Sequence, residues 1–596
     1  MKTHRRAFVL SLILLLVSAA TRPAHASAYD AKPKLVVILV LDQFRGDYLP
    51  RYQADFKTPN GFNLFLKQGA NFTDCYFDYA NTMTAPGHST IGTGAYTDGH
   101  GIAVNDWWDL SRSTTHTVSS VDDEDYKPVG LPAATGSAQA GQRMGASPRN
   151  LLASTLGDEV VLATRGESKL YGISLKDRAA ILTSGHASNG AFWLDQQSGR
   201  FITSTYWMRQ LPAWASSFND SGRIAQAYSE AGVPATSSFY NKVGPTPAAV
   251  AYELDFAKAL IQNEKLGRHD VTDVLTISIS STDMLGHQVG PDSPMQRAMI
   301  DAVDVDLDGF FTWLGNNVDG GLPNVWVALT ADHGVAPSPT EAAKLGMPAV
   351  ALDMPKIYAS VNAAVNQRFT PGQKIAYLLP GGELPYISID PRPFKNMNVG
   401  EEAAEQGVGL ALAEAMSSNA IAAPAVPKDA RSPQDASLVR RPEQEPVGKA
   451  SDVRLPPQPL LRHVYTKVQM AVGQIPETAY GNLLLHSYSP NGGWWVFATF
   501  GMYELQIGAP GSTSHFSPYS YDRHVPLAFF GAPFAPGTYH GRVEPIDIAA
   551  TLASLLGVNQ PSASTGHVLT QAIKQQHSDM PEGMTTGTAA SQGATK

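Results

Sequence analysis

Leu35-Val-Val-Ile-Leu-Val-Leu-Asp42 is the stretch that decides the fold of this chain. Its seven apolar residues suit a strand that is buried on both faces, as in the parallel sheets of α/β proteins. Two later segments repeat the design. Val274-Leu-Thr-Ile-Ser-Ile-Ser-Ser-Thr ends on Asp283, and Val325-Trp-Val-Ala-Leu-Thr-Ala ends on Asp332-His333. We therefore predict three strands of one largely parallel sheet.

Residue types that bind metals stand where these three strands end. In open α/β sheets, ligands bind beyond the carboxyl ends of the strands, so residues that follow neighbouring strands meet at one edge. Asp42, Asp283 and Asp332 occupy these positions, and His287 and His333 lie close to them in the sequence. Carboxylates and imidazoles are ligands of zinc. The sequence therefore predicts a metal centre at this edge.

The composition fits a large α/β protein. The 596 residues are 43% hydrophobic and 16% charged, which allows a sizeable core. Strand-like and helix-like segments alternate through most of the chain, so we predict an α/β fold with a mostly parallel central sheet sandwiched by helices. The formal net charge is −9 and no basic tract stands out, so we predict no specific nucleic-acid partner.

The first 26 residues have the pattern of a signal peptide. A basic start precedes the apolar stretch Phe8–Val17, and Ala24-His25-Ala26 is a small-x-small cleavage motif. The apolar stretch is too short for a comfortable membrane span. We predict cleavage before Ser27, a periplasmic or secreted product, and no stable membrane span after cleavage. The single cysteine, Cys75, excludes an intrachain disulfide.

Two long stretches separate the metal-ligand positions. Residues from about 95 to 270 and from about 340 to 510 are too long for simple connections. We therefore predict that they form cap lobes inserted in a catalytic domain that spans residues 27–571. Residues 419–459 are rich in proline and charge, so we predict a flexible insertion. Residues 572–596 are small and polar, so we predict a disordered tail.

A possible nucleophile stands in Thr84-Ala-Pro-Gly-His88. Thr84 lies two residues before Pro86, and a helix-compatible run follows, which would place the hydroxyl group at a helix N-terminus. The free N–H groups and the dipole at such an end favour an alkoxide or a phosphate. A threonine at a helix start is more often a plain N-cap. The motif alone leaves both interpretations open.

The motifs, taken together and in order, resemble those of the alkaline phosphatase superfamily. The resemblance runs from about Leu35 to Leu556. It is closest to the threonine-nucleophile, phosphate-irrepressible alkaline phosphatases, which are related to the type I phosphodiesterases and nucleotide pyrophosphatases. The segments that carry it are Asp42, Thr84-x-Pro-Gly-His88, Asn105-Asp-Trp, Ser174-Leu-Lys176-Asp-Arg178, Asp283-x-x-x-His287, Asp332-His333-Gly and the run from Ser514 to Pro526.

The resemblance implies two zinc ions per chain. The ligands would be Asp283, His287 and His515 for one ion, and Asp42, Asp332, His333 and Thr84 for the other. Phe516 follows His515 where the superfamily commonly has glycine, which makes His524 the alternative ligand. We favour His515, because His524 leads directly into a strand. We interpret His88 and His100 as supporting residues, and an additional structural calcium ion is neither indicated nor excluded.

The resemblance also implies a reaction. Thr84 would attack phosphorus and form a phosphothreonine, which water then cleaves, while the zinc ions stabilise the attacking and leaving oxygens. Asn105, Lys176 and Arg178 would bind the phosphate oxygens. Lys176 and Arg178 follow the strand-like residues 171–175, and an i, i+2 pair in an extended chain can point the same way.

A phosphate monoester carries about two negative charges near neutral pH. The cationic cluster therefore suits a monoester better than a diester, and we expect an exported phosphomonoesterase that acts on small phosphate monoesters. A phosphodiesterase or nucleotide pyrophosphatase on the same scaffold would share Thr84 and the metal ligands but should lack the Lys176 and Arg178 pair.

Three further alternatives fit less well. A sulfatase would need a Cys/Ser-x-Pro-x-Arg segment, which Thr84-Ala-Pro-Gly-His88 does not match. A mutase fits an exported chain poorly. A non-catalytic binding protein that kept the fold would be indicated by loss of a ligand or of the nucleophile, because function follows from the site and not from the fold.

Overall fold

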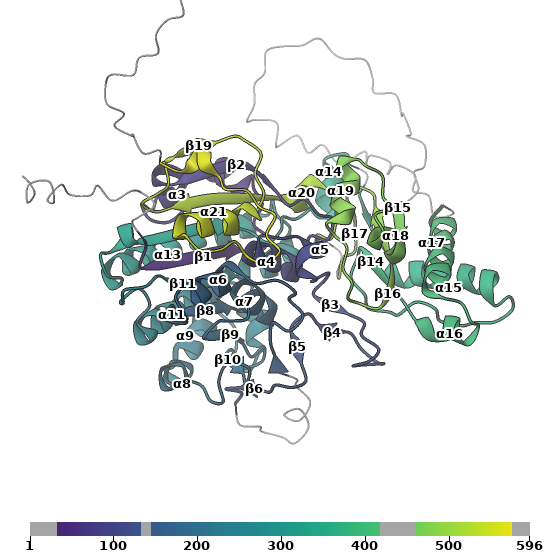
Figure 1. Ribbon diagram of the computed structural model, residues 1–596, viewed down its shortest axis with the longest axis horizontal. Coiled ribbons are helices and arrows are strands. Elements are labelled where there is room, and N and C mark those ends of the chain that lie inside the picture. The colour runs from purple at the N-terminus through teal and green to yellow at the C-terminus, as the bar shows by residue number, and fades with distance from the viewer. Residues whose placement is uncertain (1–31, 133–144, 348, 418–460, 510, 575–596) are drawn as a thin grey trace, which may run out of the picture.

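The structure is a computed structural model that describes residues 32–132, 145–347, 349–417, 461–509 and 511–574 (Figure 1). The predicted signal peptide, the predicted flexible insertion and residues 575–596 of the predicted tail lie outside the described residues. Residues 572–574 are described, and Ala572 and Ile573 are buried. Within the described ranges, no helix is long and apolar enough to cross a membrane.

A ten-stranded sheet forms the centre of the molecule. In spatial order its strands are β19 (Gly537–Tyr539), β2 (Ala70–Tyr76), β18 (His524–Phe530), β12 (Val325–Thr330), β1 (Leu35–Leu41), β11 (Asp273–Ile279), β8 (Leu170–Ser174), β9 (Gly190–Leu194), β10 (Phe201–Ser204) and β6 (Pro128–Val129). The five strands from β12 to β9 are parallel, whereas β18 and β10 run antiparallel to their neighbours. The predicted α/β fold with a mostly parallel centre is confirmed.

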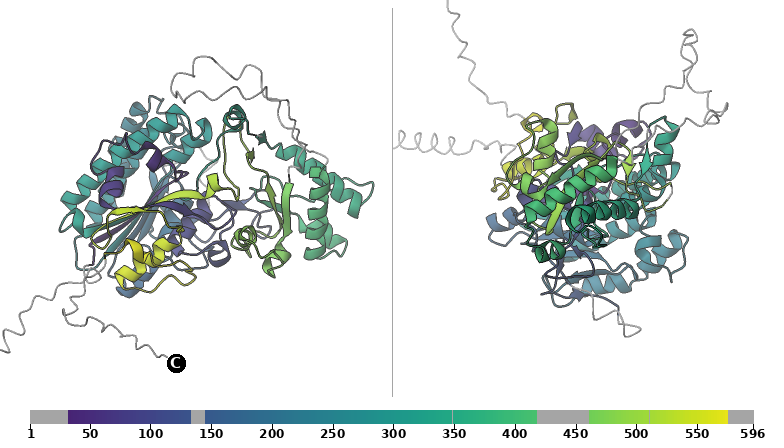
Figure 2. Two further views of the ribbon diagram at one scale, coloured as in Figure 1. Left: turned by 90° about the horizontal axis from the view of Figure 1, so that it is seen from above. Right: turned by 90° about the vertical axis from the view of Figure 1, so that its right-hand side faces the viewer.

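Helices cover both faces of this sheet, as the left view of Figure 2 shows. One group of mutually packed helices is α3 (Phe62–Gln68), α11 (Pro247–Glu264), α12 (Ser281–Val289) and α13 (Pro294–Asn317). The other is α4 (Thr84–Thr93), α6 (Leu156–Ala163), α7 (Asp177–Ser184) and α21 (Asp547–Leu556). Shorter helices include α2 (Tyr48–Tyr52), α5 (Thr97–His100), α8 (Ala213–Asp220), α9 (Arg223–Glu230) and α20 (Ser520–Arg523).

The register of β1 brings three strand ends to one level. Leu41 pairs with Ile279 of β11, and Val40 pairs with Thr330 of β12. All seven residues of β1 are buried, and fully burying an aliphatic side chain stabilises a fold by about 1.5–3 kcal/mol. The residues that follow β1, β11 and β12 therefore meet at one edge.

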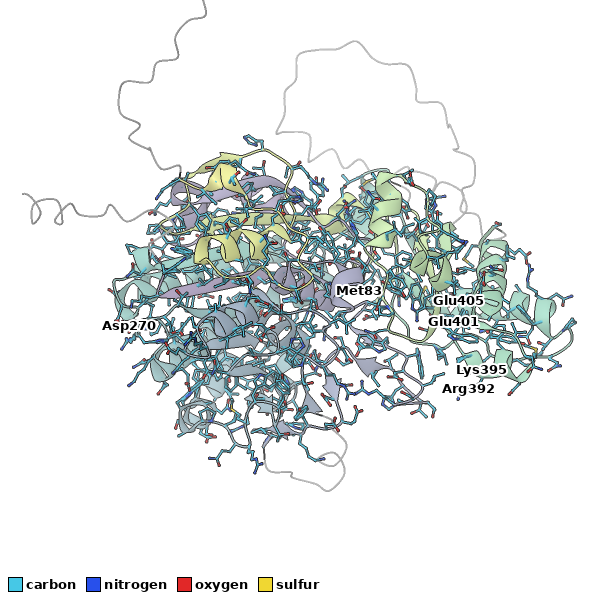
Figure 3. All side chains as sticks on the ribbon, in the orientation of Figure 1. Met83, Asp270, Arg392, Lys395, Glu401 and Glu405 are labelled. Carbon is cyan, nitrogen blue, oxygen red and sulfur yellow. The ribbon has the colours of Figure 1, made fainter. Side chains whose placement is uncertain are left out.

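The lobe from residue 350 to residue 505 is built on a second, smaller sheet. Its antiparallel strands are β14 (Tyr386–Ile389), β16 (Trp494–Phe500) and β15 (Leu461–Thr466), in that spatial order. The helices α15 (Met354–Phe369) and α17 (Glu401–Ser417) pack together, and α17 contacts β15 and β16. Figure 3 labels Glu401 and Glu405 on this lobe. The lobe falls within the range predicted for the second insertion.

The first predicted insertion, residues 95–270, differs from the expectation of a cap lobe over much of its length. β8, β9, β10 and β6 come from this segment and extend the central sheet. The physical reason is that β8 is as fully buried as β1, so it pairs with β11 and is covered by α7. The pairs β3 (Asp106–Trp107) with β4 (Val118–Ser119), and β5 (Asp122–Asp123) with β7 (Gly145–Ala146), form separate small sheets.

A hydrophobic cluster joins the lobe to the central domain. Met83 and Ala85, at the start of α4, belong to it together with Trp495 and Phe497 of β16. Figure 3 labels Met83 between the two halves of the molecule. The lobe is therefore packed next to the N-terminus of α4, which is the helix that begins at Thr84.

Candidate active site

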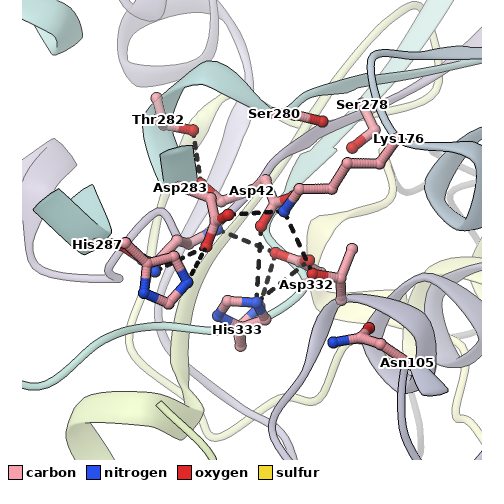
Figure 4. Close-up of polar contacts among 12 residues, drawn as sticks. Asp42, Asn105, Lys176, Ser278, Ser280, Thr282, Asp283, His287, Asp332 and His333 are labelled. Carbon is pink, nitrogen blue, oxygen red and sulfur yellow. Dashed lines mark hydrogen bonds and ion pairs between the residues drawn. The ribbon is translucent and has the colours of Figure 1, made fainter. Parts of the chain in front are cut away.

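Five of the predicted metal ligands converge at the shared edge of the sheet, and Figure 4 labels four of them, Asp42, Asp283, Asp332 and His333. Asp42 follows β1 directly, Asp332 and His333 follow β12, and Asp283 lies in the first turn of α12. His515 comes from the segment before α20. Asp42, Asp332 and His333 are 0% exposed, and Asp283 and His515 are each 4% exposed. The strand register thus places side chains that are up to 473 residues apart in one buried cluster.

The ligand atoms form two overlapping groups. Asp42, Asp332 and His333 bring one atom each to within 4.8 Å of the others, and so do Asp283, His333 and His515. The first group matches a predicted triplet, whereas the second has His333 where we predicted His287. His287 adjoins the cluster, because its Nε2 lies 3.1 Å from Asp283 Oδ1 and its ring centroid lies 5.1 Å from that of His515.

Three buried atoms of the cluster fit a bound cation. Asp42 Oδ1, Asp332 Oδ2 and His333 Nε2 have no hydrogen-bond partner within the described part of the chain. His333 Nε2 lies 3.6 Å from Asp42 Oδ1 and 3.5 Å from Asp332 Oδ2. Each unsatisfied buried polar atom costs about 1–3 kcal/mol. A metal ion would satisfy all three at once, and mixed oxygen and nitrogen donors suit zinc.

The electrostatics of the cluster agree with this fit. Burial, followed by the charges of Asp283 and Asp332, raises the pKa of Asp42 well above its ordinary value. Burial also lowers the pKa of His515, and the neighbouring His333 and His287 lower it further. A neutral imidazole is the form that binds metal. Carboxylates crowded beside neutral imidazoles are the arrangement that a divalent cation stabilises.

Backbone carbonyl groups orient the three imidazole rings. Nδ1 of His287 contacts Thr513 O at 2.8 Å, and Nδ1 of His515 contacts Thr82 O at 2.6 Å. His333 Nδ1 contacts its neighbour's carbonyl oxygen at 2.9 Å. Because a carbonyl group only accepts, each Nδ1 carries the hydrogen. Burial lowers the pKa values of His333 and His515, so these two rings are neutral and their lone pair is on Nε2, the nitrogen left free to bind a metal ion.

Gln43 links two carboxylates of the cluster, and we did not predict it from the sequence. Its backbone N–H donates to Asp332 Oδ1 at 3.0 Å, and its Nε2 donates to Asp283 Oδ1 at 2.7 Å. Its φ is +62°, in the left-handed region that non-glycine residues rarely adopt. The one available signal was its place directly after Asp42, where the chain leaves the strand.

The helix α4 begins at Thr84, at the position predicted for a helix start. Thr84 is 2% exposed, and Lys176 Nζ lies 3.4 Å from its Oγ1. His88 Nδ1 contacts Thr84 O at 2.8 Å and lies 3.3 Å from Asp332 Oδ2, so this ring ties the helix start to the carboxylate cluster. His100 is buried further along α4, where its Nε2 is 3.2 Å from Thr90 Oγ1.

Gly87 allows α4 to approach the cluster closely. A Cβ atom at this position would lie 2.3 Å from Asp332 O and 2.7 Å from Asp332 Cβ. These atoms belong to the backbone and the first side-chain carbon, so they cannot yield without moving the carboxylate. We expect Gly87→Ala to lower the free energy of unfolding by about 1–3 kcal/mol, the usual cost of overpacking, as measured by urea denaturation.

The control for this prediction is Gly309→Ala in α13, where an added Cβ meets nothing within 4 Å. That change should be neutral or stabilising by about 0.5–1 kcal/mol, because alanine is the better helix former. Equal stabilities for the two variants would mean that α4 does not depend on the close approach at Gly87.

Lys176 and Arg178 do not extend from one strand as predicted. β8 ends at Ser174, Lys176 is the N-cap of α7, and Arg178 lies in its first turn. The prediction required an extended chain from Lys176 to Arg178, but α7 already begins at Asp177. Lys176 Nζ forms ion pairs with Asp42 Oδ2 and Asp283 Oδ2, each at 2.6 Å.

The two cationic side chains nevertheless line one cavity of about 360 Å³, together with Tyr240 and Trp193. Burial disfavours both charges, but Asp283 and Asp42 raise the pKa of Lys176 above its ordinary value, and Tyr240 and Asp177 raise that of Arg178. Both side chains therefore stay positively charged, and Lys176 does so beside Thr84, Asp42 and Asp283.

Asn105 lies at the N-terminus of α4. Its Oδ1 accepts a hydrogen bond from Ala85 N–H at 2.9 Å, and Figure 4 labels it below the carboxylate cluster. Ala85 directly follows Thr84, so the side-chain amide of Asn105 is bound to the residue next to the predicted nucleophile. The structure thus brings together Thr84, Asn105, Lys176 and the acidic cluster.

The structure separates the two candidate histidines. His524 begins β18, its ring stacks on Tyr76 with centroids 4.5 Å apart, and its Nε2 contacts Thr73 O at 3.1 Å. His515 lies in the cluster. Phe516, which follows it, has φ +87°. This backbone conformation favours glycine, which accounts for the glycine that the superfamily commonly has there.

Comparison with known proteins places this geometry in a family. The profile of the type I phosphodiesterase/nucleotide pyrophosphatase family matches residues 36–419. Alkaline phosphatase PafA of Elizabethkingia meningoseptica is 31% identical over 94% of this chain and 98% of its own length. Alkaline phosphatase PhoV of Synechococcus elongatus is 31% identical over 95% of this chain and 99% of its own.

A crystal structure of wild-type alkaline phosphatase PafA superimposes on this fold with a TM-score of 0.75 at 29% identity, and covers 91% of this chain and 99% of the other. The match covers nearly the full length of both chains, so it concerns the whole architecture. The chain therefore belongs to the type I phosphodiesterase/nucleotide pyrophosphatase family of the alkaline phosphatase superfamily.

Proposed function

We propose that this protein is a phosphomonoesterase that hydrolyses small phosphate monoesters through a phosphothreonine at Thr84. One observation carries the proposal: Thr84 Oγ1 sits at a buried helix start, 3.4 Å from Lys176 Nζ, beside a cluster of three carboxylates and buried histidines. The two relatives named alkaline phosphatase, which match nearly the full chain, support the same reaction class.

The chemistry of the chain's own residues fits a double displacement. The Thr84 oxygen attacks phosphorus, the bond between phosphorus and the ester oxygen breaks, and the alcohol leaves with a proton. Water then attacks the phosphothreonine, which releases inorganic phosphate and restores the Thr84 hydroxyl group. The positive charge of Lys176 favours the Thr84 alkoxide and offsets the charge on phosphate, and Asn105 and Arg178 supply further donors.

We propose two zinc ions per chain, held by the two predicted ligand sets. One set is Asp283, His287 and His515, and the other is Asp42, Asp332, His333 and Thr84. The orphaned atoms Asp42 Oδ1, Asp332 Oδ2 and His333 Nε2 support the second set. When bound, zinc would supply Lewis-acid stabilisation of the attacking and leaving oxygens. A structural calcium ion has no separate support.

We also propose that the protein is exported to the periplasm or the medium. The support is the sequence pattern of residues 1–26, with a basic start, an apolar stretch and Ala24-His25-Ala26. The proposed catalytic domain spans residues 27–571 and includes the lobe from 350 to 505 as its inserted cap.

The second candidate function is a phosphodiesterase, because the matching family is named for type I phosphodiesterases. The feature against it is the pair of cations Lys176 and Arg178, because a diester has one charge and one free oxygen fewer than a monoester. A site built for diesters would have little use for both Lys176 and Arg178. Measured rates on a nitrophenyl monoester and on a nitrophenyl diester would distinguish the two functions.

Arg178 provides the sharper test of monoester preference, because Lys176 also holds two carboxylates. A hydrogen bond to a charged group is worth about 1.5–3 kcal/mol. At about 1.36 kcal/mol per tenfold, Arg178→Ala should lower monoester kcat/KM about 10- to 150-fold. The rate on the diester should fall less, so the ratio of the monoester rate to the diester rate should decrease. Adding Lys176→Ala should decrease this ratio further. The effects of the two substitutions need not add, because both side chains are proposed to bind the same phosphate group.

Arg200→Ala is the matched control, because Arg200 is a half-buried arginine that directly precedes β10 and pairs with Asp220 at 2.8 Å. It should leave both rates near those of the parent protein. Zinc content must be measured for the variant that lacks Lys176. Equal losses on monoester and diester in Arg178→Ala, with normal zinc content, would favour the phosphodiesterase.

A further inference from the structure

A loop of the lobe contacts the central domain beside the N-terminus of α4, next to the proposed phosphate-binding residue Asn105. The segment between α15 and β14 contacts residues 105–108 at two points. Trp108 Nε1 donates to Pro380 O at 2.9 Å, and Asn105 N–H donates to Glu383 Oε2 at 3.0 Å. Glu383 is 278 residues from Asn105 in the sequence, and it belongs to none of the motifs that the sequence analysis identified.

The side chain of Asn105 is held at both ends. Its Oδ1 accepts from Ala85 N–H at 2.9 Å, and its Nδ2 lies 3.4 Å from Glu383 Oε1. An amide whose oxygen is fixed must turn its NH₂ group to the opposite side. One N–H of that group faces Glu383, and this leaves the second N–H for an oxygen of the phosphate.

A carboxylate suits this position better than an amide. Glu383 accepts from both the backbone N–H and the side-chain NH₂ of Asn105, and an ionised carboxylate has two accepting oxygens, whereas glutamine has one. Burial, followed by the charge of Asp106, raises the pKa of Glu383 to about 7, and Arg178 lowers it. At the alkaline pH of a phosphatase assay, the side chain is ionised and accepts both bonds.

We propose that Glu383 is a positioning residue, contributed by the inserted lobe, that fixes the amide of Asn105 in the direction required to bind phosphate. This inference rests on the proposed phosphomonoesterase function. It gives the lobe a part in catalysis without placing any of its residues on the reacting atoms, since Glu383 acts through Asn105.

The test is a double-mutant cycle with a nitrophenyl monoester. Glu383→Ala should lower kcat/KM about tenfold, the scale of one lost hydrogen bond. Glu383→Gln should lose less, because its amide oxygen can still accept the Asn105 N–H. In an Asn105→Ala background, Glu383→Ala should change kcat/KM less than about twofold, since contacting residues couple in such a cycle. Inhibition by inorganic phosphate should weaken in parallel with kcat/KM.

Glu405→Gln is the matched control. Glu405 is a fully buried glutamate of the same lobe whose pKa burial also raises to about 7, and its Oε2 accepts from Val468 N–H. It lies on α17 (Figure 3), and its Oε2 hydrogen bond goes to Val468 and not to Asn105, so kcat/KM and phosphate inhibition should stay near those of the parent protein. Thermal unfolding of every variant shows whether it is folded.

Three outcomes would overturn the inference. In the first, Glu383→Ala lowers kcat/KM by the same factor in the parent protein and in the Asn105→Ala background. In the second, Glu383→Gln lowers kcat/KM as much as Glu383→Ala does. In the third, Glu405→Gln lowers kcat/KM as much as either Glu383 variant. Each would mean that Glu383 supports only the general stability of the lobe. A parent protein that carries zinc but hydrolyses no monoester would instead refute the proposed function, so the two failures are distinguishable.

Discussion

Protein stripped of metal by a chelator is expected to lose turnover of phosphate monoesters by at least about 10³-fold, because a Lewis acid contributes several kcal/mol at such a centre and about 1.36 kcal/mol corresponds to tenfold. The reason lies in the cluster around Asp42, Asp332 and His333, where three buried ligand atoms face one another without a hydrogen-bond partner in the described chain. Added Zn²⁺ should restore the rate. Elemental analysis of active protein should find two zinc ions per chain.

The control is the fold of the stripped protein. The central sheet is covered on both faces and its core does not depend on the cluster, so circular dichroism should remain native-like without metal. The thermal midpoint should rise when zinc is added, because a ligand that binds only the folded state stabilises it. Full activity in protein shown to contain no metal would exclude the two-zinc centre.

The strands and the ligand positions could be predicted because their signals are local. A continuous apolar run predicts a buried parallel strand, and Asp42 and Asp332 directly follow such runs. The register of a parallel sheet then brings them together without further information. The helix start at Thr84 also has a local signal, since Pro86 fits the first turn of a helix.

The remainder of the site depends on contacts that have no local pattern. Gln43 lies next to a predicted ligand, but its two bonds to Asp283 and Asp332 require the folded sheet. Glu383 reaches Asn105 only because the lobe packs beside α4. The pairing of Lys176 with Asp42 likewise follows from the point at which α7 begins, which the apolar run of β8 does not specify.

Replacing Thr84 with alanine should reduce monoester turnover by at least about 10³-fold, on the scale of the loss when an enzyme nucleophile is removed. The hydroxyl group is proposed to form the covalent bond to phosphorus, and no neighbouring side chain of α4 offers a substitute at the same place. Thr84→Ser keeps a hydroxyl group and should retain more activity than Thr84→Ala. Mass spectrometry of acid-quenched parent enzyme should find phosphate on the peptide that contains Thr84.

The fold and most of the metal centre should survive this change. Thr84 is buried but contributes only a small side chain, and the ligand atoms of Asp42, Asp332 and His333 remain. Thr93→Ala is the matched control, because Thr93 is a buried threonine of the same helix whose Oγ1 donates to Ser89 O at 2.7 Å. It should leave turnover nearly unchanged. Unchanged turnover in Thr84→Ala, or stoichiometric phosphate on another residue, would assign the nucleophile elsewhere, and the carboxylate cluster would then have to activate water directly.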